Sequence, residues 1–521
     1  MREENHFLQK RVNLFDGISI VAGAMIGSGI FIVSADIARN VGSPGWLLVV
    51  WLITGIMTLI GAISYGELAS MMPHVGGQYV YLREAYNPLI GFLFGWTTFL
   101  VIQCGTIAAV AVAFAKFSGV LFPWISEKNI LFRMGPVNVN STMVIAIAMI
   151  SFLTWLNTRG IVTGKTVQNI FSSTKVIALF GFITIGFLAT KSINSLEINK
   201  DIFWHASKVG PGNQTIPLVG FALIAAIGSA LVGSLFSADA WYNVTYISGE
   251  VINPKRNVPL SLLFGTLIVS ALYLLTNYIY IKILPLTGSP DGMDALSRGI
   301  QYATDDRVAT SAMSVVFGDS AAIIMAVFIM ISTFGCNNGL IMAGPRVYYA
   351  MAKDGLFFRK IGEINRKGVP GFAIVVQGIW SVLLCMSGTY GNLLDYVIFA
   401  VLIFFTLTIL AIFILRVKRP DIPRPYKAFG YPVIPSIYII ATITIMVILL
   451  IYKPDYTFPG LGIVILGIPV FYLWKRKDDW PISDEGEKGR RGEGEKGRLR
   501  DQEILRPELA DKSRSGLRSM R

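Results

Sequence analysis

One apolar segment near the start of the chain concentrates small residues. Gly23, Gly27, Ser28 and Gly29 fall within nine residues that end at Phe31, and glycine and serine are poor residues for a helix interior. An unwound stretch here would free backbone amides at the start of the next half-helix, where the helix dipole also favours an anion. The run therefore predicts either a broken helix that binds an anionic group or a face for close helix packing.

A second apolar segment further along the chain is interrupted in the same way. Gly228-Ser229 and Gly233-Ser234 precede Asp239 there, and a carboxylate deep in an apolar segment usually faces a cavity or a partner. Two interrupted segments in corresponding halves indicate an inverted-repeat transporter with a site at the middle of the membrane. The pair favours broken helices at both places. Asp239 then either attracts an ammonium group or holds the unwound turn.

A lysine lies deep in a third apolar segment. Lys175 follows Phe171-Ser172-Ser173-Thr174 and is about ten residues from the nearer end of its span, which is too deep for its ammonium to reach water easily. It either pairs with helix carbonyls for structural reasons or acts beside the first broken helix. In the second case the ammonium replaces a bound cation, or it takes up and releases a proton.

These groups need long apolar helices to position them. Charged residues make up 15% of the 521 residues and the mean hydropathy is +0.59, whereas soluble domains have a charged fraction of roughly 25%. Helices of about 20 apolar residues cross a bilayer, so we expect an all-α integral membrane protein with twelve transmembrane helices. The predicted spans are residues 14–39, 45–70, 88–117, 141–157, 166–190, 216–249, 259–283, 318–352, 370–388, 391–415, 431–452 and 458–474.

The positions of the basic residues predict the orientation of the spans. With the N-terminus inside, the inner segments hold 21 Lys and Arg and the outer segments hold 10. This asymmetry predicts a multi-pass protein of the plasma (inner) membrane with both termini in the cytoplasm. The net charge of +13 is thereby explained without nucleic acid as a partner. We expect no signal peptide and a disordered tail over 478–521, where 11 basic residues face 11 acidic ones.

The sequence offers no catalytic or metal-binding pattern. Cys104, Cys336 and Cys385 all lie in apolar segments, and the three histidines have no partner at metal-ligand spacing. We find no HExxH, GxSxG or Walker motif. We therefore expect neither an enzyme nor an ATP-driven pump, and no metal or cofactor.

Three further stretches complete a pattern that resembles a known family. Tyr65-Gly66-Glu67-Leu68 ends the second predicted span, the run from Gly249 to Pro259 follows the sixth, and the run from Gly344 to Gly355 ends the eighth. With the first glycine run, they resemble the amino acid–polyamine–organocation superfamily over about residues 10–477. Within it, the chain is most similar to the L-type amino acid transporters and their prokaryotic exchanger relatives.

The resemblance implies a LeuT-like fold with two inverted five-helix repeats and two additional helices. The first repeat would cover residues 14–190 and the second 216–415, with the additional helices at 431–474. Residues 1–13 would be the cytoplasmic N-terminus, and 478–521 the charged cytoplasmic tail.

The resemblance also implies roles for individual residues. Amides around Gly27, Ser28 and Gly29 would hold the carboxylate of an amino acid, and carbonyls near Ile26 and around Phe236 and Asp239 would hold its ammonium. Phe236 would be the gate over the substrate, and Lys175 would replace the sodium ion of sodium-coupled relatives. The predicted substrate-binding set is Ile26, Gly27, Ser28, Gly29, Phe236, Ser237, Asp239, Tyr242, Cys104 and Asn338, and further polar candidates near the side-chain pocket are Gln103, Thr106 and Asn337.

The chain departs from the family at two positions. Thr158 stands where animal members carry a cysteine that bonds a heavy chain, so we expect no disulfide-linked partner. Tyr242 replaces an asparagine near the substrate side chain, which favours small neutral amino acids. The sequence thus predicts a sodium-independent secondary transporter of neutral L-amino acids, by exchange or proton-coupled symport, in contact with membrane lipid. The alternative is a membrane sensor that binds amino acids without transporting them.

Overall fold

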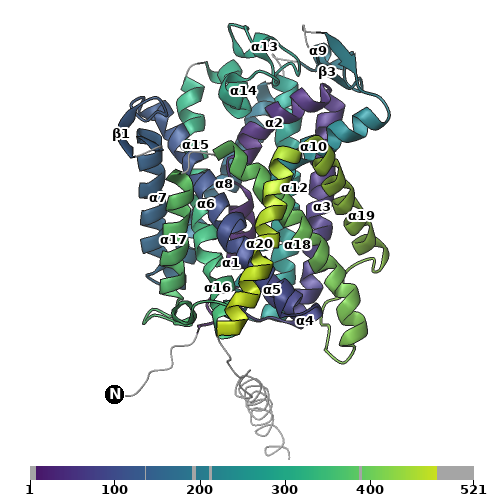
Figure 1. Ribbon diagram of the computed structural model, residues 1–521. Coiled ribbons are helices and arrows are strands. Elements are labelled where there is room, and N and C mark those ends of the chain that lie inside the picture. The colour runs from purple at the N-terminus through teal and green to yellow at the C-terminus, as the bar shows by residue number, and fades with distance from the viewer. Residues whose placement is uncertain are drawn as a thin grey trace, which may run out of the picture. The chain divides into compact units, whose positions relative to one another are not determined.

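The protein is built almost wholly from helices. The computed structural model describes residues 8–134, 137–189, 195–210, 214–318, 320–386 and 390–477, and Figure 1 shows long helices running side by side with small elements at the ends. The predicted tail at 478–521 lies outside the described residues, as do residues 1–7 of the predicted N-terminal segment.

The first half of the chain contains the first interrupted segment. Its helices are α1 (Leu14–Met25), α2 (Gly29–Val41), α3 (Pro44–Met71), α4 (Gln78–Ala85), α5 (Pro88–Thr97), the π-helix η1 (Thr98–Ile102), α6 (Gln103–Leu121), α7 (Ser141–Asn157), α8 (Ile161–Ala189) and α9 (Leu196–Lys200). Its strands are β1 (Ile130–Met134), β2 (Val137–Asn140), β3 (Ser207–Val209) and β4 (Thr215–Pro217), which form the antiparallel pairs β1–β2 and β3–β4.

The second half begins with the other interrupted segment. Its helices are α10 (Phe221–Ser237), α11 (Asn243–Tyr246), η3 (Ser248–Glu250), α12 (Pro254–Ile283), α13 (Ala295–Arg298), η4 (Thr304–Asp306), α14 (Val308–Phe317), α15 (Ser320–Ala343), α16 (Pro345–Lys353), η5 (Arg359–Gly362), α17 (Gly371–Met386), α18 (Tyr390–Lys418), α19 (Val433–Tyr452) and α20 (Pro454–Lys477).

The helix boundaries follow local sequence signals. Ser43 and Asn87 cap α3 and α5 by accepting hydrogen bonds from backbone amides of the first turn, and each cap precedes a proline. Proline is favoured there because its missing N–H would have no helical partner. Asn13 and Asp16 form a reciprocal capping box at the start of α1. The start of the first interrupted segment is therefore fixed by its own sequence.

The expectation of an all-helical membrane protein is confirmed at this level. Every predicted span overlaps a helix, and eight helical stretches of the described residues are long and apolar enough to cross a membrane. Counting the bent pair α1 and α2 as one further span gives nine. The helices α7, α10, α14 and α17 are apolar but have only 10 to 17 residues.

The segment 284–317, which lies between two of the predicted spans, contains helices. The longest is α14, which buries Val308, Ala309, Ala312 and Met313 and packs against α15 and α2. With 10 residues it is too short to cross a bilayer, so hydropathy alone did not distinguish it from a loop.

The interrupted helices lie at the centre of the packing. The helix α1 packs against α12, α8 and α15, whereas α10 packs against α2, α3 and α19. At the end where α1 begins, Lys165 pairs with Asp16 at 2.7 Å, and Arg346 pairs with Glu250 at 2.8 Å with both side chains buried. These contacts hold the first half of the broken helix to its neighbours.

Candidate functional site at two broken helices

The first interrupted segment is a broken helix. Hydrogen bonding typical of a helix continues to the amide of Ile26, α2 begins at Gly29, and the two helices differ in direction by 43°. Ile26 itself has extended backbone angles. The small residues that predicted an interruption are therefore the residues at which the helix breaks.

The break frees four carbonyl oxygens, and side chains of three other helices bond all of them. In an unbroken helix, Gly23, Ala24, Met25 and Ile26 would accept from the amides four residues later. Here Lys175 donates to Gly23 and Ile26, Cys336 to Ala24, and Tyr273 to Met25, while the single hydroxyl proton of Ser332 lies within reach of both the Ile26 and the Gly27 oxygen. Since buried carbonyls need partners, these side chains stabilise the unwound backbone.

The matching amides of the break remain unbonded. Within the part of the chain that the structure describes, the amides of Gly27, Ser28, Gly29 and Ile30 make no hydrogen bond, and the first amide with a partner is that of Phe31. These amides lie at the N-terminal end of α2, where the helix dipole favours negative charge. The geometry can therefore bind an anionic group such as a carboxylate.

Lys175 lies where the sequence predicted, beside the first broken helix. It comes from α8, its side chain is buried, and its ammonium nitrogen is 2.6 Å from the Gly23 oxygen and 2.8 Å from the Ile26 oxygen. Both interpretations of this lysine, structural and functional, require these contacts. Its positive charge lies beside the freed carbonyls, which are also the groups that would bind a cation.

The second interrupted segment breaks after Ser237. The chain is unwound between α10 and α11, and Ala240 adopts a left-handed backbone conformation with φ of 66°. The hydroxyl of Tyr273 lies 3.1 Å from the carbonyl oxygens of both Ser237 and Met25. An added Cβ on Gly29 would collide with Ser237. The two broken helices are thus in direct contact, and one hydroxyl bridges their ends.

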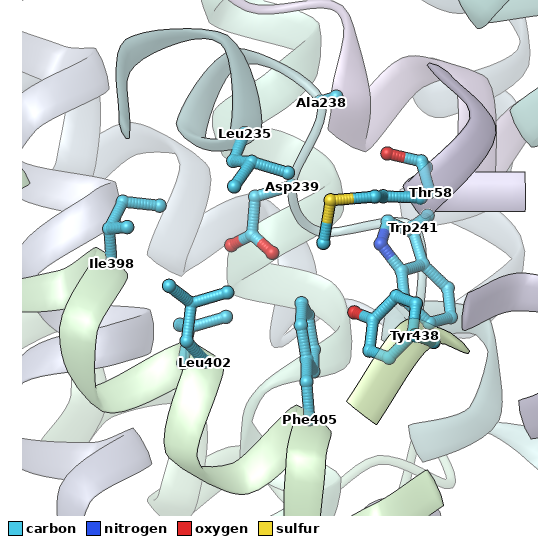
Figure 2. A pocket seen from close by; sticks show the side chains of 11 residues that line it. Thr58, Leu235, Ala238, Asp239, Trp241, Ile398, Leu402, Phe405 and Tyr438 are labelled. Carbon is cyan, nitrogen blue, oxygen red and sulfur yellow. The ribbon is translucent and has the colours of Figure 1, made fainter. Parts of the chain in front are cut away.

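The Asp239 carboxylate faces away from solvent into a small cavity. Its Oδ2 accepts from the hydroxyl of Tyr242 at 3.2 Å, and its Oδ1 has no hydrogen-bond partner among the described residues. Figure 2 shows this side chain between α10, α3, α18 and α19, with Thr58, Phe405 and Tyr438 among the lining residues. The cavity of about 20 Å³ has room for one water molecule. Asp239 has an unused acceptor in this arrangement.

The remaining predicted residues divide between this site and the helix packing. Phe236 is half-buried near the end of α10, and Tyr242 packs on Trp241, Tyr246 and Phe405. Cys104 contacts the carbonyl of Gln377 on α17.

Asn338 is used in packing three helices. It accepts from Asn157 of α7 and donates to Gly164 and Gln168 of α8. These contacts do not bring Cys104 and Asn338 to the broken helices. Their predicted role in the pocket remains a prediction.

Of the further polar candidates, Gln103 and Asn337 donate to the backbone oxygens of Leu340 and Ile107, and Thr106 bonds within its own helix.

Three residues that contact the break were missed from the sequence. Ser332 and Cys336 are four residues apart on α15 and therefore share one face, and Tyr273 belongs to α12. The four-residue spacing of Ser332 and Cys336 in an apolar span indicated that they share one helix face. It did not reveal which neighbouring helix that face contacts. All three cysteines of the chain are buried.

Comparison with known proteins agrees with this geometry. A family model described as amino acid permease matches residues 12–470. The b(0,+)-type amino acid transporter 1 of Mus musculus is 28% identical over 479 residues, which cover 89% of this chain and 88% of the relative. The large neutral amino acids transporter small subunit 2 of Homo sapiens is 29% identical over 479 residues, which cover 90% and 82%.

The names of these relatives concern two predictions, the absence of a disulfide-linked partner chain and the functional class of the protein. The second relative is named a small subunit, so the prediction that this chain has no disulfide-linked partner gains no support from it. Both relatives are named as amino acid transporters, and the apolar helices fit a multi-pass membrane protein. The match over nearly all of its length shows that the chain belongs to the amino acid permease family, a family of membrane transporters and not of enzymes.

Proposed function

We propose that this permease is a secondary active transporter of neutral L-amino acids in the plasma membrane. It works without sodium, by exchange or proton-coupled symport with alternating access. The observation that carries the proposal is the asymmetry of the first break, where the freed carbonyls are bonded by side chains and the freed amides of Gly27 to Ile30 are not. Because every amino acid has a carboxylate, unbonded amides at a helix N-terminus suit this substrate class.

The ammonium of the substrate needs acceptors on the opposite side of the site. The Ile26 oxygen already accepts from the Lys175 ammonium and lies 3.1 Å from the Ser332 hydroxyl, so it is engaged by neighbouring side chains. Acceptors with unused capacity belong to the second break, at the Ser237 carbonyl and at Asp239 Oδ1. We therefore assign the carboxylate to the first break and the ammonium to the second, with Phe236 as the gate.

The position of Lys175 supports the proposal of sodium independence. Its ammonium bonds two carbonyls that would otherwise be available to a metal cation. A fixed positive charge there excludes a second cation by repulsion. A lysine that keeps its proton throughout the cycle fits exchange, whereas one that releases it fits proton symport.

The proposed architecture has twelve spans in a LeuT-like arrangement. Nine spans come from the long helices and the bent pair, and α7, α10 and α17 supply the other three. We assign 14–190 and 216–415 to the two inverted repeats and 431–474 to the two additional helices, with both termini in the cytoplasm. The breaks in α1–α2 and α10–α11 then occupy matching places in the two repeats, as expected for a central site.

The proposed transporter works without a disulfide-linked partner. Thr158 has no thiol, and its hydroxyl donates to the Trp155 carbonyl. The three cysteines of the chain are buried in helices. A covalent link to another chain would require one of them to leave its packing.

Uptake by the purified chain in proteoliposomes tests the proposal. We would follow radiolabelled neutral amino acids with the vesicle interior empty or loaded, in sodium and in choline buffer, and with a stepped pH. Uptake only into loaded vesicles means exchange, and uptake into empty vesicles driven by a proton gradient means symport. Uptake that requires sodium contradicts the role of Lys175.

Binding without transport would mean a sensor. A chain that binds amino acids but never accelerates tracer entry under counterflow refutes the proposal. Gly27→Leu, reconstituted in the same way, is the negative control because it fills the space beside the amides.

A further inference from the structure

The connection between α6 and α7 exposes apolar side chains outside the helices. The large apolar side chains with 43% to 57% of their surface exposed in this segment are Phe122, Trp124, Ile130, Leu131 and Phe132. The segment includes the hairpin of β1 and β2 and lies at the end of the helices opposite the start of α1 (Figure 1). Exposed apolar groups of this kind usually mark a contact surface.

The exposure belongs to an ordered segment. The carbonyl of Trp124 accepts from the side chains of Asn129 and Ser141 at 2.9 and 2.8 Å. The Ser141 hydroxyl also accepts from the amide of Ser126, and Ser141 is the first residue of α7. The backbone around Trp124 is therefore fixed to the start of a helix, and the indole is held outward.

The strand β1 exposes three consecutive apolar side chains. In a half-buried strand, apolar residues alternate with polar ones because successive side chains point to opposite faces. Here the consecutive residues Ile130, Leu131 and Phe132 are all exposed, and the pairing with β2 is irregular between Ile130 and Phe132. An irregularity of this kind redirects side chains. The strand thus presents apolar groups on both faces.

The depth and charge of the segment fit the edge of a bilayer. It starts where α6 ends at Leu121 and finishes where α7 begins at Ser141. Lys128 and Arg133 are exposed within it, and Glu127 pairs with Lys116. Aromatic rings and basic groups gather at the membrane–water boundary, where rings lie among headgroups and cations meet phosphates.

We propose that residues 122–133 are a lipid anchor that lies in the headgroup region of the bilayer. Trp124, Leu131 and Phe132 contact the upper acyl chains, and Lys128 and Arg133 contact lipid phosphate. The anchor holds the ends of α6 and α7 at a fixed depth. It is independent of the substrate that the chain carries.

Fluorescence quenching in proteoliposomes tests the anchor. We would place an environment-sensitive NBD label on Leu131→Cys of the full chain, in which the native cysteines are buried. Leu296→Cys on α13, with 42% exposure, is the matched control from another connecting segment. Lipids with a nitroxide at acyl carbon 5 should quench the Leu131 label at least twofold more than the Leu296 label. Iodide in the buffer should do the reverse.

Two results with iodide would contradict the lipid anchor. If iodide quenches the Leu131 label as strongly as the Leu296 label, the segment faces water. If the label is protected from iodide only when another protein chain is added, the surface docks a protein and not lipid. Ile130→Cys repeats the measurement where Leu131→Cys fails to fold, and amino acid uptake by each labelled variant shows that it is folded.

Discussion

The ammonium nitrogen of Lys175 lies 2.8 Å from the carbonyl oxygen of Ile26, the residue at which α1 stops. A second carbonyl, that of Gly23, is 2.6 Å away. One charged side chain thereby bonds two carbonyls that the break leaves without helical partners. The lysine and the break depend on each other, because a straight helix would use these carbonyls itself.

Replacing Lys175 should therefore affect both stability and transport. In Lys175→Met, two buried carbonyls lose a charged donor, and each buried group without a partner costs about 1–3 kcal/mol. We expect a lower melting temperature and loss of amino acid uptake. Lys116→Met is the control, since Lys116 is partly exposed and pairs with Glu127 near a helix end. Wild-type uptake by Lys175→Met would show that the charge has no part in transport.

The glycines of the break should differ in their tolerance of a side chain. An added Cβ on Gly27 meets only the Cys336 sulfur, at 3.5 Å, whereas one on Gly29 meets the Ser237 backbone at 3.0 Å and collides with its hydroxyl. Gly27→Ala should fold normally and Gly29→Ala should not, as measured by the yield of monodisperse protein. Gly27→Leu and Ser28→Leu should insert but transport nothing. Normal uptake by both leucine variants would refute the assignment of the carboxylate to these amides.

The hydroxyl of Tyr273 should affect both substrate affinity and stability. It lies 3.1 Å from the end carbonyls of both broken helices, and one hydroxyl proton can be donated to only one of them at a time. Tyr273→Phe removes the bridge without changing the packing and should raise KM for uptake at least fivefold. The buried Met25 carbonyl also loses its donor, which costs about 1–3 kcal/mol, so the melting temperature should fall as well. Tyr280→Phe, which loses a single bond to Ile30, should leave KM near the wild-type value.

Much of the site could be predicted because its signals are local. Glycine and serine weaken a helix, and the first break lies at Gly27 and Ser28 as their run indicates. In the second segment the pairs Gly228-Ser229 and Gly233-Ser234 lie inside α10, and the chain unwinds only after Ser237. The structure also places Lys175 beside the first break, where a lysine so far from either helix end finds buried partners. The family was identifiable from the order of the short motifs, without any knowledge of the packing.

Other features depend on how helices rotate and pack, and the sequence does not contain that information locally. Tyr273, Ser332 and Cys336 reach the break only because α12 and α15 turn particular faces toward α1. The polar character of Asn338 suggested a pocket, yet its partners lie on α7 and α8. The hairpin β1–β2 was missed because β1 exposes three consecutive apolar residues, Ile130, Leu131 and Phe132, and because the alternating strand β2 is only four residues long.

The buried pair of Arg346 and Glu250 should be a major determinant of stability. Both side chains are buried, and the guanidinium makes two bonds to the carboxylate. Arg346→Ala leaves a buried carboxylate without its partner, which typically costs about 3–5 kcal/mol. We expect a large drop in melting temperature. The double variant Arg346→Met/Glu250→Gln should melt higher than Arg346→Ala, since it leaves no unpaired charge.

The backbone of Glu250 connects this ion pair to the N-terminal segment. Its carbonyl accepts from the amides of Arg11 and Val12, so loosening the pair should also loosen the start of α1. Hydrogen exchange of residues 11–16 should rise in Arg346→Ala and remain low in the double variant. Equal melting temperatures for the two variants would show that the unpaired carboxylate is not what destabilises Arg346→Ala.

A variant of Asn338 tests whether this residue acts in the substrate pocket or only in helix packing. Its side chain joins α15 to α7 and α8 through bonds of 2.9 to 3.0 Å to Asn157, Gly164 and Gln168, which uses its oxygen and both amide hydrogens. A residue so occupied has little capacity to bind a substrate. Asn338→Ala should therefore lower the melting temperature while leaving the ranking of neutral amino acids in competition assays unchanged.

Tyr242→Asn is the comparison, because Tyr242 bonds Asp239 beside the second break. Its replacement should widen the range of substrate side chains that the transporter accepts. If Asn338→Ala alters the ranking and Tyr242→Asn does not, the pocket lies on the α15 side and the assignment of the second break must be revised.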